Sequence, residues 1–200
     1  DDVRTLTAER LAADGIAVDV ITGGFPCQDI SVAGNQAGIT GGTRSGLWSE
    51  IDRLICELRP RFVIVENVAN LLAGPSERPG GWFGRVLGDL AERGYNAEWE
   101  NIPASALGAP HRRERVWLVA YPDQDGREFG ILSARRLQPL ESALIWEPFR
   151  AASFAVQLPE LATICGNDDG FPEELGACGN AVVPQIPELI GNAILQAMNE

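Results

Sequence analysis

Apolar residues recur along this chain with the spacing of helices in some stretches and of strands in others. Between residues 47 and 58 they fall every three or four positions, which predicts an amphipathic helix that Pro60 ends. The apolar run within 61–65 predicts a strand buried on both faces of a parallel sheet. The same reasoning predicts strands at 18–22, 95–102 and 115–121, and helices at 82–91 and 186–197.

The alternation of strands and helices predicts an α/β fold with a largely parallel sheet. Two segments interrupt this order. Residues 23–46 are rich in glycine and lack an apolar period, so we predict one long loop, and loops of that length usually carry function. Residues 122–178 hold scattered prolines and aromatic residues, which indicate an insertion or small lobe of irregular structure.

Composition limits the classes of function open to the chain. Its 200 residues and 45% hydrophobic content fit one ordinary domain with at most a small appendage. All 16 basic residues are arginine, which excludes Walker-type phosphate loops and lysine-dependent mechanisms. The net charge of −12 argues against a general nucleic-acid coat, although the arginines within 103–150 leave room for a local basic surface.

Cysteine and apolar content bear on metals and membranes. The four cysteines form no C-x-x-C pair and the chain has one histidine, so no metal site is predicted. The apolar runs are far shorter than the roughly 20 residues that cross a bilayer, and nothing resembles a signal peptide. We therefore predict a cytoplasmic protein without a membrane partner.

Candidate chemistry follows two predicted strands, at the sheet edge where α/β proteins bind ligands. After the first strand, Cys27 follows Pro26 in the glycine-rich loop, and a thiol is the strongest nucleophile among ordinary side chains. A cysteine can equally be a small buried apolar residue, which is our interpretation of Cys56, Cys165 and Cys178. The loop context favours the nucleophile for Cys27.

Glu66 ends the next strand, where burial would raise the pKa of its carboxyl and let it hold or donate a proton near neutrality. The alternative is a carboxylate that accepts hydrogen bonds from the start of the next helix. Arg113 and Arg115 lie two positions apart before or within a strand and would share a face, where they would bind an anion or a polarised oxygen. The alternative is that both arginines lie on a solvated, charged edge and pair with Glu114.

Five motifs follow one another along the chain: Gly-Gly-Phe-Pro-Cys-Gln-x-x-Ser-x-Ala-Gly at 23–34, Arg-Ser-Gly-Leu-Trp at 44–48, Glu-Asn-Val at 66–68, x-x-Arg-x-Arg at 111–115 and Gly-Asn-Ala-Val-Val-Pro at 179–184. They occur in the order found in DNA (cytosine-5) methyltransferases, and the chain most resembles the compact bacterial and phage members. The resemblance covers about residues 2–121 and 165–198. It implies a Rossmann-like methyltransferase sheet.

The resemblance implies a reaction on a cytosine flipped out of double-stranded DNA. Cys27 would add to carbon 6 of the ring while Glu66 hydrogen-bonds or protonates ring nitrogen 3. Carbon 5 would then take a methyl group from S-adenosyl-L-methionine, and loss of its proton with expulsion of the thiolate would restore the ring.

The resemblance also assigns supporting roles. Asn67 would order the loop that carries Cys27, and Arg113 and Arg115 would contact the carbonyl oxygen and phosphates of the flipped nucleotide. Gln28 and Ser31 lie on the loop expected to close over DNA. Positions matching the cofactor pocket are Asp2, Pro26, Leu47, Asn180 and Ala181.

By the same resemblance, residues 1–121 are part of the catalytic domain, 122–164 a short target-recognition region, and 165–200 a segment that returns to the catalytic domain. His111 stands where the family usually has Gln, and Ala181 where many members have Ser. The chain has no G-x-G, so the family's first cofactor loop is missing. We therefore expect an N-terminally truncated sheet that alone neither binds S-adenosyl-L-methionine tightly nor turns over.

The leading hypothesis is thus that the chain is part of a DNA (cytosine-5) methyltransferase. This enzyme would be monomeric and nucleoid-associated, with a restriction endonuclease as a possible counterpart. A second hypothesis is a non-catalytic relic that binds DNA or a partner. A third is a hydrolase with a Cys27–His111 pair, which would leave Glu66 and the two arginines idle.

Overall fold

The computed structural model describes residues 2–25, 47–72, 81–107, 112–124, 128–133, 137 and 182–199. They belong to two compact units, one within 1–102 and 114–133 and the other within 103–113 and 134–200. Of the long loop predicted at 23–46, Gly23 belongs to a strand and residues 26–46 lie outside the described residues. Most of the recognition region predicted at 122–164 lies outside them as well. The domain boundaries expected from the resemblance therefore stay a prediction.

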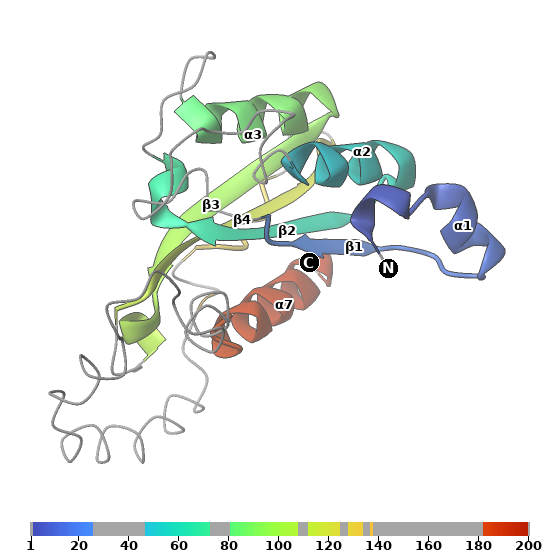
Figure 1. Ribbon diagram of the computed structural model, residues 1–200. Coiled ribbons are helices and arrows are strands. Elements are labelled where there is room, and N and C mark those ends of the chain that lie inside the picture. Colours follow the sequence, from blue (N-terminus) through green and yellow to red (C-terminus); the bar gives the residue numbers. More distant parts are fainter. Residues whose placement is uncertain are drawn as a thin grey trace, which may run out of the picture. The chain divides into compact units, whose positions relative to one another are not determined.

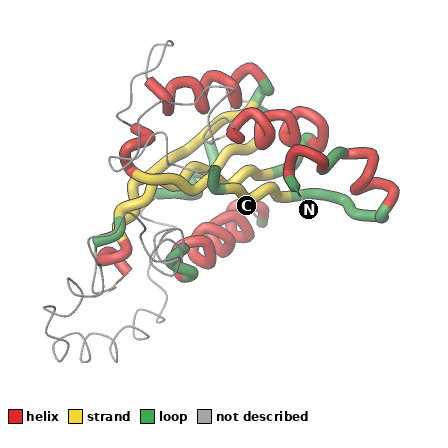
Figure 2. The backbone as a smooth tube through the Cα atoms, viewed as in Figure 1, coloured by secondary structure: helices red, strands yellow, loops and turns green. Residues whose placement is uncertain are grey.

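The first unit is built on a four-stranded sheet in the order β1-β2-β4-β3 (Figures 1 and 2). The strands are β1 (Val20–Gly23), β2 (Phe62–Val68), β3 (Tyr95–Pro103) and β4 (Glu114–Pro122). β1 and β2 are parallel, whereas β4 runs antiparallel to β2. The predicted α/β alternation and all four strands are confirmed to within a few residues.

The prediction of a largely parallel sheet is wrong, because β4 lies between β2 and β3 and reverses direction relative to β2. The connection from β3 to β4 spans only residues 104–113, of which Ala104–Leu107 form the short 3₁₀ helix η4. A crossover between parallel strands takes about a dozen residues or more, usually with an α-helix. The sheet is therefore mixed.

Two amphipathic helices pack on one face of the sheet, as Figure 1 shows. These are α2 (Trp48–Leu58) and α3 (Gly81–Glu92), both confirmed by position. α2 ends at Leu58 and is capped by Arg59, whose left-handed backbone precedes Pro60, as predicted from the proline. Cys56 of α2 is exposed, so its interpretation as a buried apolar residue is wrong. Four short elements of the described part were not predicted: the helix α1 (Ala8–Ala13) and the 3₁₀ helices η1 (Val3–Thr5), η3 (Ala69–Leu72) and η4.

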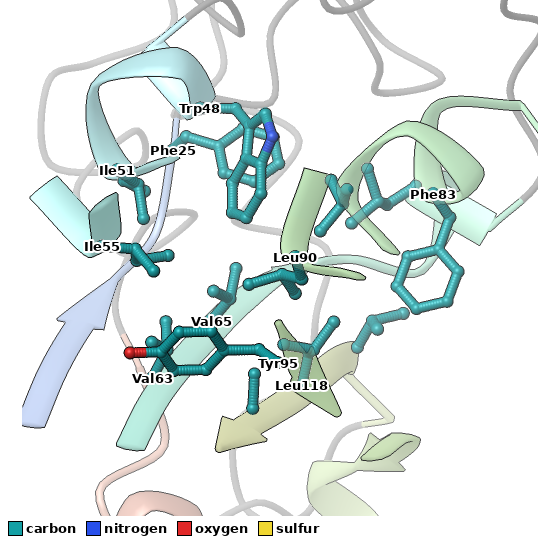
Figure 3. Packing of buried hydrophobic residues seen from close by; sticks show 14 of the residues in the cluster. Phe25, Trp48, Ile51, Ile55, Val63, Val65, Phe83, Leu90, Tyr95 and Leu118 are labelled. Atoms are coloured by element: carbon teal, nitrogen blue, oxygen red, sulfur yellow. The ribbon is translucent and has the colours of Figure 1, made fainter. Parts of the chain in front are cut away.

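The core of this unit lies between the two helices and the alternate side chains of β2 and β4 that face them (Figure 3). Val63 and Val65 of β2 and Leu118 of β4 are at most 2% exposed. The buried members of the cluster are Phe25, Trp48, Ile51, Ile55, Val63, Val65, Leu71, Trp82, Phe83, Val86, Leu90, Tyr95, Val116, Leu118 and Ala120.

On the opposite face, Tyr121 joins β4 to residues 128–133. Its hydroxyl donates to Glu98 at 2.7 Å and accepts from the backbone N–H of Phe129 at 3.2 Å. Burial raises the pKa of Tyr121, and the hydrogen bond to Glu98 raises it further, so the phenol stays protonated at neutral pH.

The second unit contains α7 (Gln185–Met198), the terminal helix that the sequence predicts. Along the described stretches of the chain, no helix is both long and apolar enough to cross a membrane.

Two glycine substitutions are expected to change stability in opposite directions. Gly191 lies inside α7 with open space where a Cβ would go, so Gly191→Ala should raise the free energy of unfolding by up to about 1 kcal/mol.

Gly94 follows α3 with a φ of +75°, a backbone conformation that disfavours any residue with a Cβ. Gly94→Ala should therefore lower the free energy of unfolding by about 1–2 kcal/mol. Urea unfolding followed by circular dichroism measures both, and changes of equal sign would contradict the backbone argument.

Candidate active site

The carboxyl ends of β1 and β2 lie side by side, because Gly23 pairs with Val65 in the parallel register. Gly24 follows directly and lies against Glu66. A Cβ at Gly24 would stand 3.3 Å from the Glu66 carboxylate Oε2 and 3.4 Å from its backbone oxygen. Only a residue without a side chain fits this close approach comfortably, so the backbone that follows β1 lies against Glu66 at Gly24.

Glu66 and Asn67 lie within β2 and not after it, since the strand continues to Val68 instead of ending at residue 65. The extension is held by pairing with β4, in which Glu66 stands opposite Trp117 and Asn67 opposite Val116. Side chains alternate along a strand, so Glu66 and Asn67 point to opposite faces of the sheet. They therefore have different partners.

The carboxylate of Glu66 forms an ion pair with Arg115, whose Nε lies 3.0 Å from Oε1. Both side chains are 19% exposed, so each is largely removed from water. The sequence indicated that Glu66 is removed from water but not that a guanidinium stands beside it.

Asn67 is a buried amide, 3% exposed, with hydrogen bonds at both ends of its side chain. Its Nδ2 donates to the backbone carbonyl of Phe25 at 3.2 Å, and its Oδ1 accepts from the backbone N–H of Val68 at 2.9 Å. The first of these bonds joins β2 to the residue that precedes Pro26 and Cys27. Asn67 thus fixes the backbone two residues before the predicted nucleophile.

The ring of Phe25 packs on Trp48, the first residue of α2, with ring centroids 5.8 Å apart (Figure 3). Trp48 is fully buried, and its indole N–H donates to Asp89 of α3 at 2.9 Å. Leu47, a predicted cofactor residue, is partly buried and packs against the same core. Trp48 stands in the motif at 44–48, but its spacing indicated only a core position, so its contact with Phe25 was missed.

Arg113 differs from its predicted place. β4 begins at Glu114, one residue later, and Arg113 has a φ of +27°, so the alternation argument that put it on one face with Arg115 does not apply. The N–H of Ala104 donates to the carbonyls of Arg112 at 2.8 Å and Arg113 at 3.2 Å, which fixes this turn. Arg113 belongs to the second unit and Arg115 to the first.

Asp2, another predicted cofactor residue, caps η1 and binds Arg4. The Nε of Arg4 lies 3.0 Å from its Oδ1, and hydrogen bonds from Arg4 hold the pKa of Asp2 at about 2. The remaining predicted site residues lie outside the described residues: Pro26, Cys27, Gln28, Ser31, His111, Asn180 and Ala181.

The described part of the site contains a carboxylate with an adjacent guanidinium, and a buried amide that holds the backbone at Phe25. A carboxylate can exchange a proton, and a guanidinium can bind a polarised oxygen or a phosphate. Within the described ranges, no group of three or more His, Cys, Asp or Glu side chains could hold a metal ion. The arrangement suits proton transfer to a polar ligand that enters at this edge of the sheet.

Comparison with known proteins agrees with the motifs. The family model described as C-5 cytosine-specific DNA methylase matches residues 1–157. The Type II methyltransferase M.Sau3AI of Staphylococcus aureus is 34% identical over 158 residues, which cover 78% of this chain and 37% of that protein. The Type II methyltransferase M2.ScrFI of Lactococcus lactis is 36% identical over 128 residues, covering 62% of this chain and 34% of that protein.

A solved structure gives the same picture for the fold. The crystal structure of an E. coli prophage protein, assigned as a DNA modification methyltransferase, matches with a TM-score of 0.51 and 25% identity over 70% of this chain and 37% of that one. The predicted Rossmann-like methyltransferase fold is thereby confirmed. The chain spans little more than a third of the length of these relatives.

Proposed function

Because the chain belongs to the C-5 cytosine-specific DNA methylase family, we propose that it carries the cytosine-binding and nucleophilic part of an enzyme that methylates carbon 5 of cytosine in DNA. The observation that carries this proposal is the Glu66–Arg115 pair, with 3.0 Å between Oε1 and Nε, at the edge where the segment with Cys27 begins. An acid and a cation lie at this edge, and together with the thiol of Cys27 they would supply the groups that addition to a pyrimidine requires.

In the proposed reaction, the thiolate of Cys27 forms a bond to carbon 6 of a flipped-out cytosine, and the displaced electron pair moves toward carbon 5. Glu66 hydrogen-bonds to ring nitrogen 3 and limits the negative charge on the ring. Arg115 lies beside Glu66 and binds the carbonyl oxygen on carbon 2, whereas Arg113 binds a phosphate. Once carbon 5 has accepted a methyl group, loss of its proton and departure of the thiolate would restore the ring.

S-adenosyl-L-methionine, the methyl donor of the family, would supply an electrophilic methyl group to carbon 5. Of the two predicted cofactor residues in the described part, Leu47 fits this role, since its side chain is partly buried against the hydrophobic core and offers apolar surface. Asp2 fits less well, because Arg4 already binds both oxygens of its carboxylate. The other cofactor residues remain proposals from the motifs alone.

We also propose double-stranded DNA as the substrate. The support is the family and the names of the relatives, which are Type II methyltransferases. A restriction endonuclease counterpart and a monomeric state extend this proposal.

Covalent trapping tests the proposal. DNA duplexes in which every cytosine carries fluorine at carbon 5 make knowledge of the recognition sequence unnecessary, and fluorine cannot leave as a cation, so the adduct persists. The protein as its gene encodes it, mixed with this DNA and S-adenosyl-L-methionine, should give a complex stable to denaturing electrophoresis. Mass spectrometry should place the bond on Cys27, and Cys27→Ala should give no complex.

Unfluorinated duplexes provide the control, since the enzyme should release them. A protein that binds DNA and cofactor yet forms no adduct would contradict the proposal and favour the non-catalytic relic.

A further inference from the structure

We propose that Asp89, a carboxylate on α3 outside every sequence motif of the site, is a positioning residue for Cys27. It would act through Trp48 and Phe25, which connect α3 to the segment that carries the nucleophile. This inference rests on the proposed function, because it concerns the rate at which Cys27 attacks cytosine.

The first contact in this connection is the hydrogen bond from the indole Nε1 of Trp48 to Oδ2 of Asp89, 2.9 Å long. Trp48 is fully buried, so its N–H has no water to bond with when Asp89 is replaced. The side chain of Asp89 is 14% exposed, its Oδ2 lies 3.6 Å from the Nε of Arg85, and a carboxylate oxygen is a strong acceptor. Asp89 therefore fixes the orientation of the indole ring.

The second contact is between the Trp48 and Phe25 rings, 5.8 Å apart at their centroids and tilted by 57°. Phe25 is 4% exposed, and Asn67 holds its carbonyl from the other side at 3.2 Å. Two residues thus hold Phe25: Asn67 binds its backbone carbonyl, and Trp48 packs against its side chain.

Only Pro26 separates Phe25 from Cys27 along the chain. Proline fixes its own φ and restricts the backbone of the residue before it, so a displacement of Phe25 is expected to displace Cys27 as well. A nucleophile displaced by about 1 Å can react about a hundred times more slowly. Loss of the Asp89 hydrogen bond is expected to slow attack by Cys27 without altering any group that touches the base.

Asp52 offers a matched control. It lies on α2 and binds Arg93, just after α3, at 2.8 Å, so it joins the same two helices as the Trp48–Asp89 bond. Its side chain is 16% exposed, close to the value for Asp89. Replacing either aspartate removes one helix-to-helix contact, but it is Asp89 that accepts the indole hydrogen bond of Trp48.

The experiment measures single-turnover adduct formation on the fluorinated duplex by the wild type, Asp89→Leu, Asp89→Asn and Asp52→Leu. Asp89→Leu should form the adduct at least tenfold more slowly, with duplex affinity within twofold of the wild type. Asp89→Asn keeps an acceptor oxygen and should recover to within threefold. Asp52→Leu should match the wild-type rate per folded molecule, even where its urea midpoint falls as far as that of Asp89→Leu.

Equal rates for Asp89→Leu and the wild type, or equal losses in Asp89→Leu and Asp52→Leu, would overturn the positioning role. If Asp89→Leu does not fold, Trp48→Phe removes the same hydrogen bond from the donor side and should show the same slow adduct formation; a wild-type rate would overturn the inference. A wild type that forms no adduct would instead refute the proposed function itself.

Discussion

Glu66→Gln is expected to slow methyl transfer to DNA by a factor of about 10² to 10⁴, the usual contribution of a positioned acid or base. Glutamine keeps the size of the side chain and can still donate a hydrogen bond to ring nitrogen 3. It cannot deliver a proton there, so negative charge builds up on the ring when Cys27 adds. It also leaves Arg115, whose Nε lies 3.0 Å from Oε1, without its anionic partner.

Rapid-quench single turnovers with labelled S-adenosyl-L-methionine measure this loss on the step itself. Because both members of the pair are only 19% exposed, some loss of stability accompanies it, and rates must be normalised to the folded fraction. Glu57→Gln is the control, since Glu57 pairs with Arg53 at 2.7 Å on the surface of α2 and should react at the wild-type rate. A Glu66→Gln rate within threefold of the wild type would remove Glu66 from the mechanism.

The elements of the first unit could be predicted wherever one local period dominates. Apolar positions at helical spacing located α2 and α3, and Pro60 located the end of α2. The direction of β4 could not be predicted in this way, because it depends on which strand β4 pairs with. The end of β2 was missed for the same reason: Glu66 and Asn67 interrupt the apolar run, but pairing with Trp117 and Val116 keeps them in the strand.

The site was predictable where chain order alone brings residues together. Strands that run parallel present their carboxyl ends at one edge, so Glu66 was expected near the segment after β1, and Gly24 does lie against it. The Glu66–Arg115 pair and the Trp48–Asp89 bond join residues 49 and 41 positions apart through sheet and helix packing. No local pattern of residue types carries that information.

Asn67→Asp is expected to lower the free energy of unfolding by about 3–5 kcal/mol at pH 7, the cost of an uncompensated charge in the interior. The two side chains have nearly the same shape. At neutral pH, however, a carboxylate oxygen would replace the Nδ2 donor 3.2 Å from the Phe25 carbonyl, so attraction becomes repulsion. Asn67 is 3% exposed, so water cannot relieve the charge.

The loss should depend on pH with a definite sign. An aspartate in an unfolded chain has a pKa of about 3.9, and burial raises the pKa of the introduced carboxyl in the folded variant above that value. A group whose pKa is raised on folding stabilises the protein below its unfolded pKa, and this contribution is lost as pH rises through the folded pKa. The difference in unfolding free energy between wild type and variant should therefore be small near pH 4 and grow toward pH 7.

Urea unfolding at pH 4, 5.5 and 7 measures this difference, with Asn199→Asp as the control. Like Asn67, Asn199 donates a hydrogen bond from its side-chain Nδ2 to a backbone carbonyl. The acceptor is Leu195 at 2.8 Å, and the position is exposed. Water solvates a carboxylate there, so the control should lose less than about 1 kcal/mol at every pH. Equal losses in the two variants, or a loss in Asn67→Asp that does not change with pH, would show that the Phe25 carbonyl does not depend on a buried donor. The backbone before Cys27 would then have to be held in some other way.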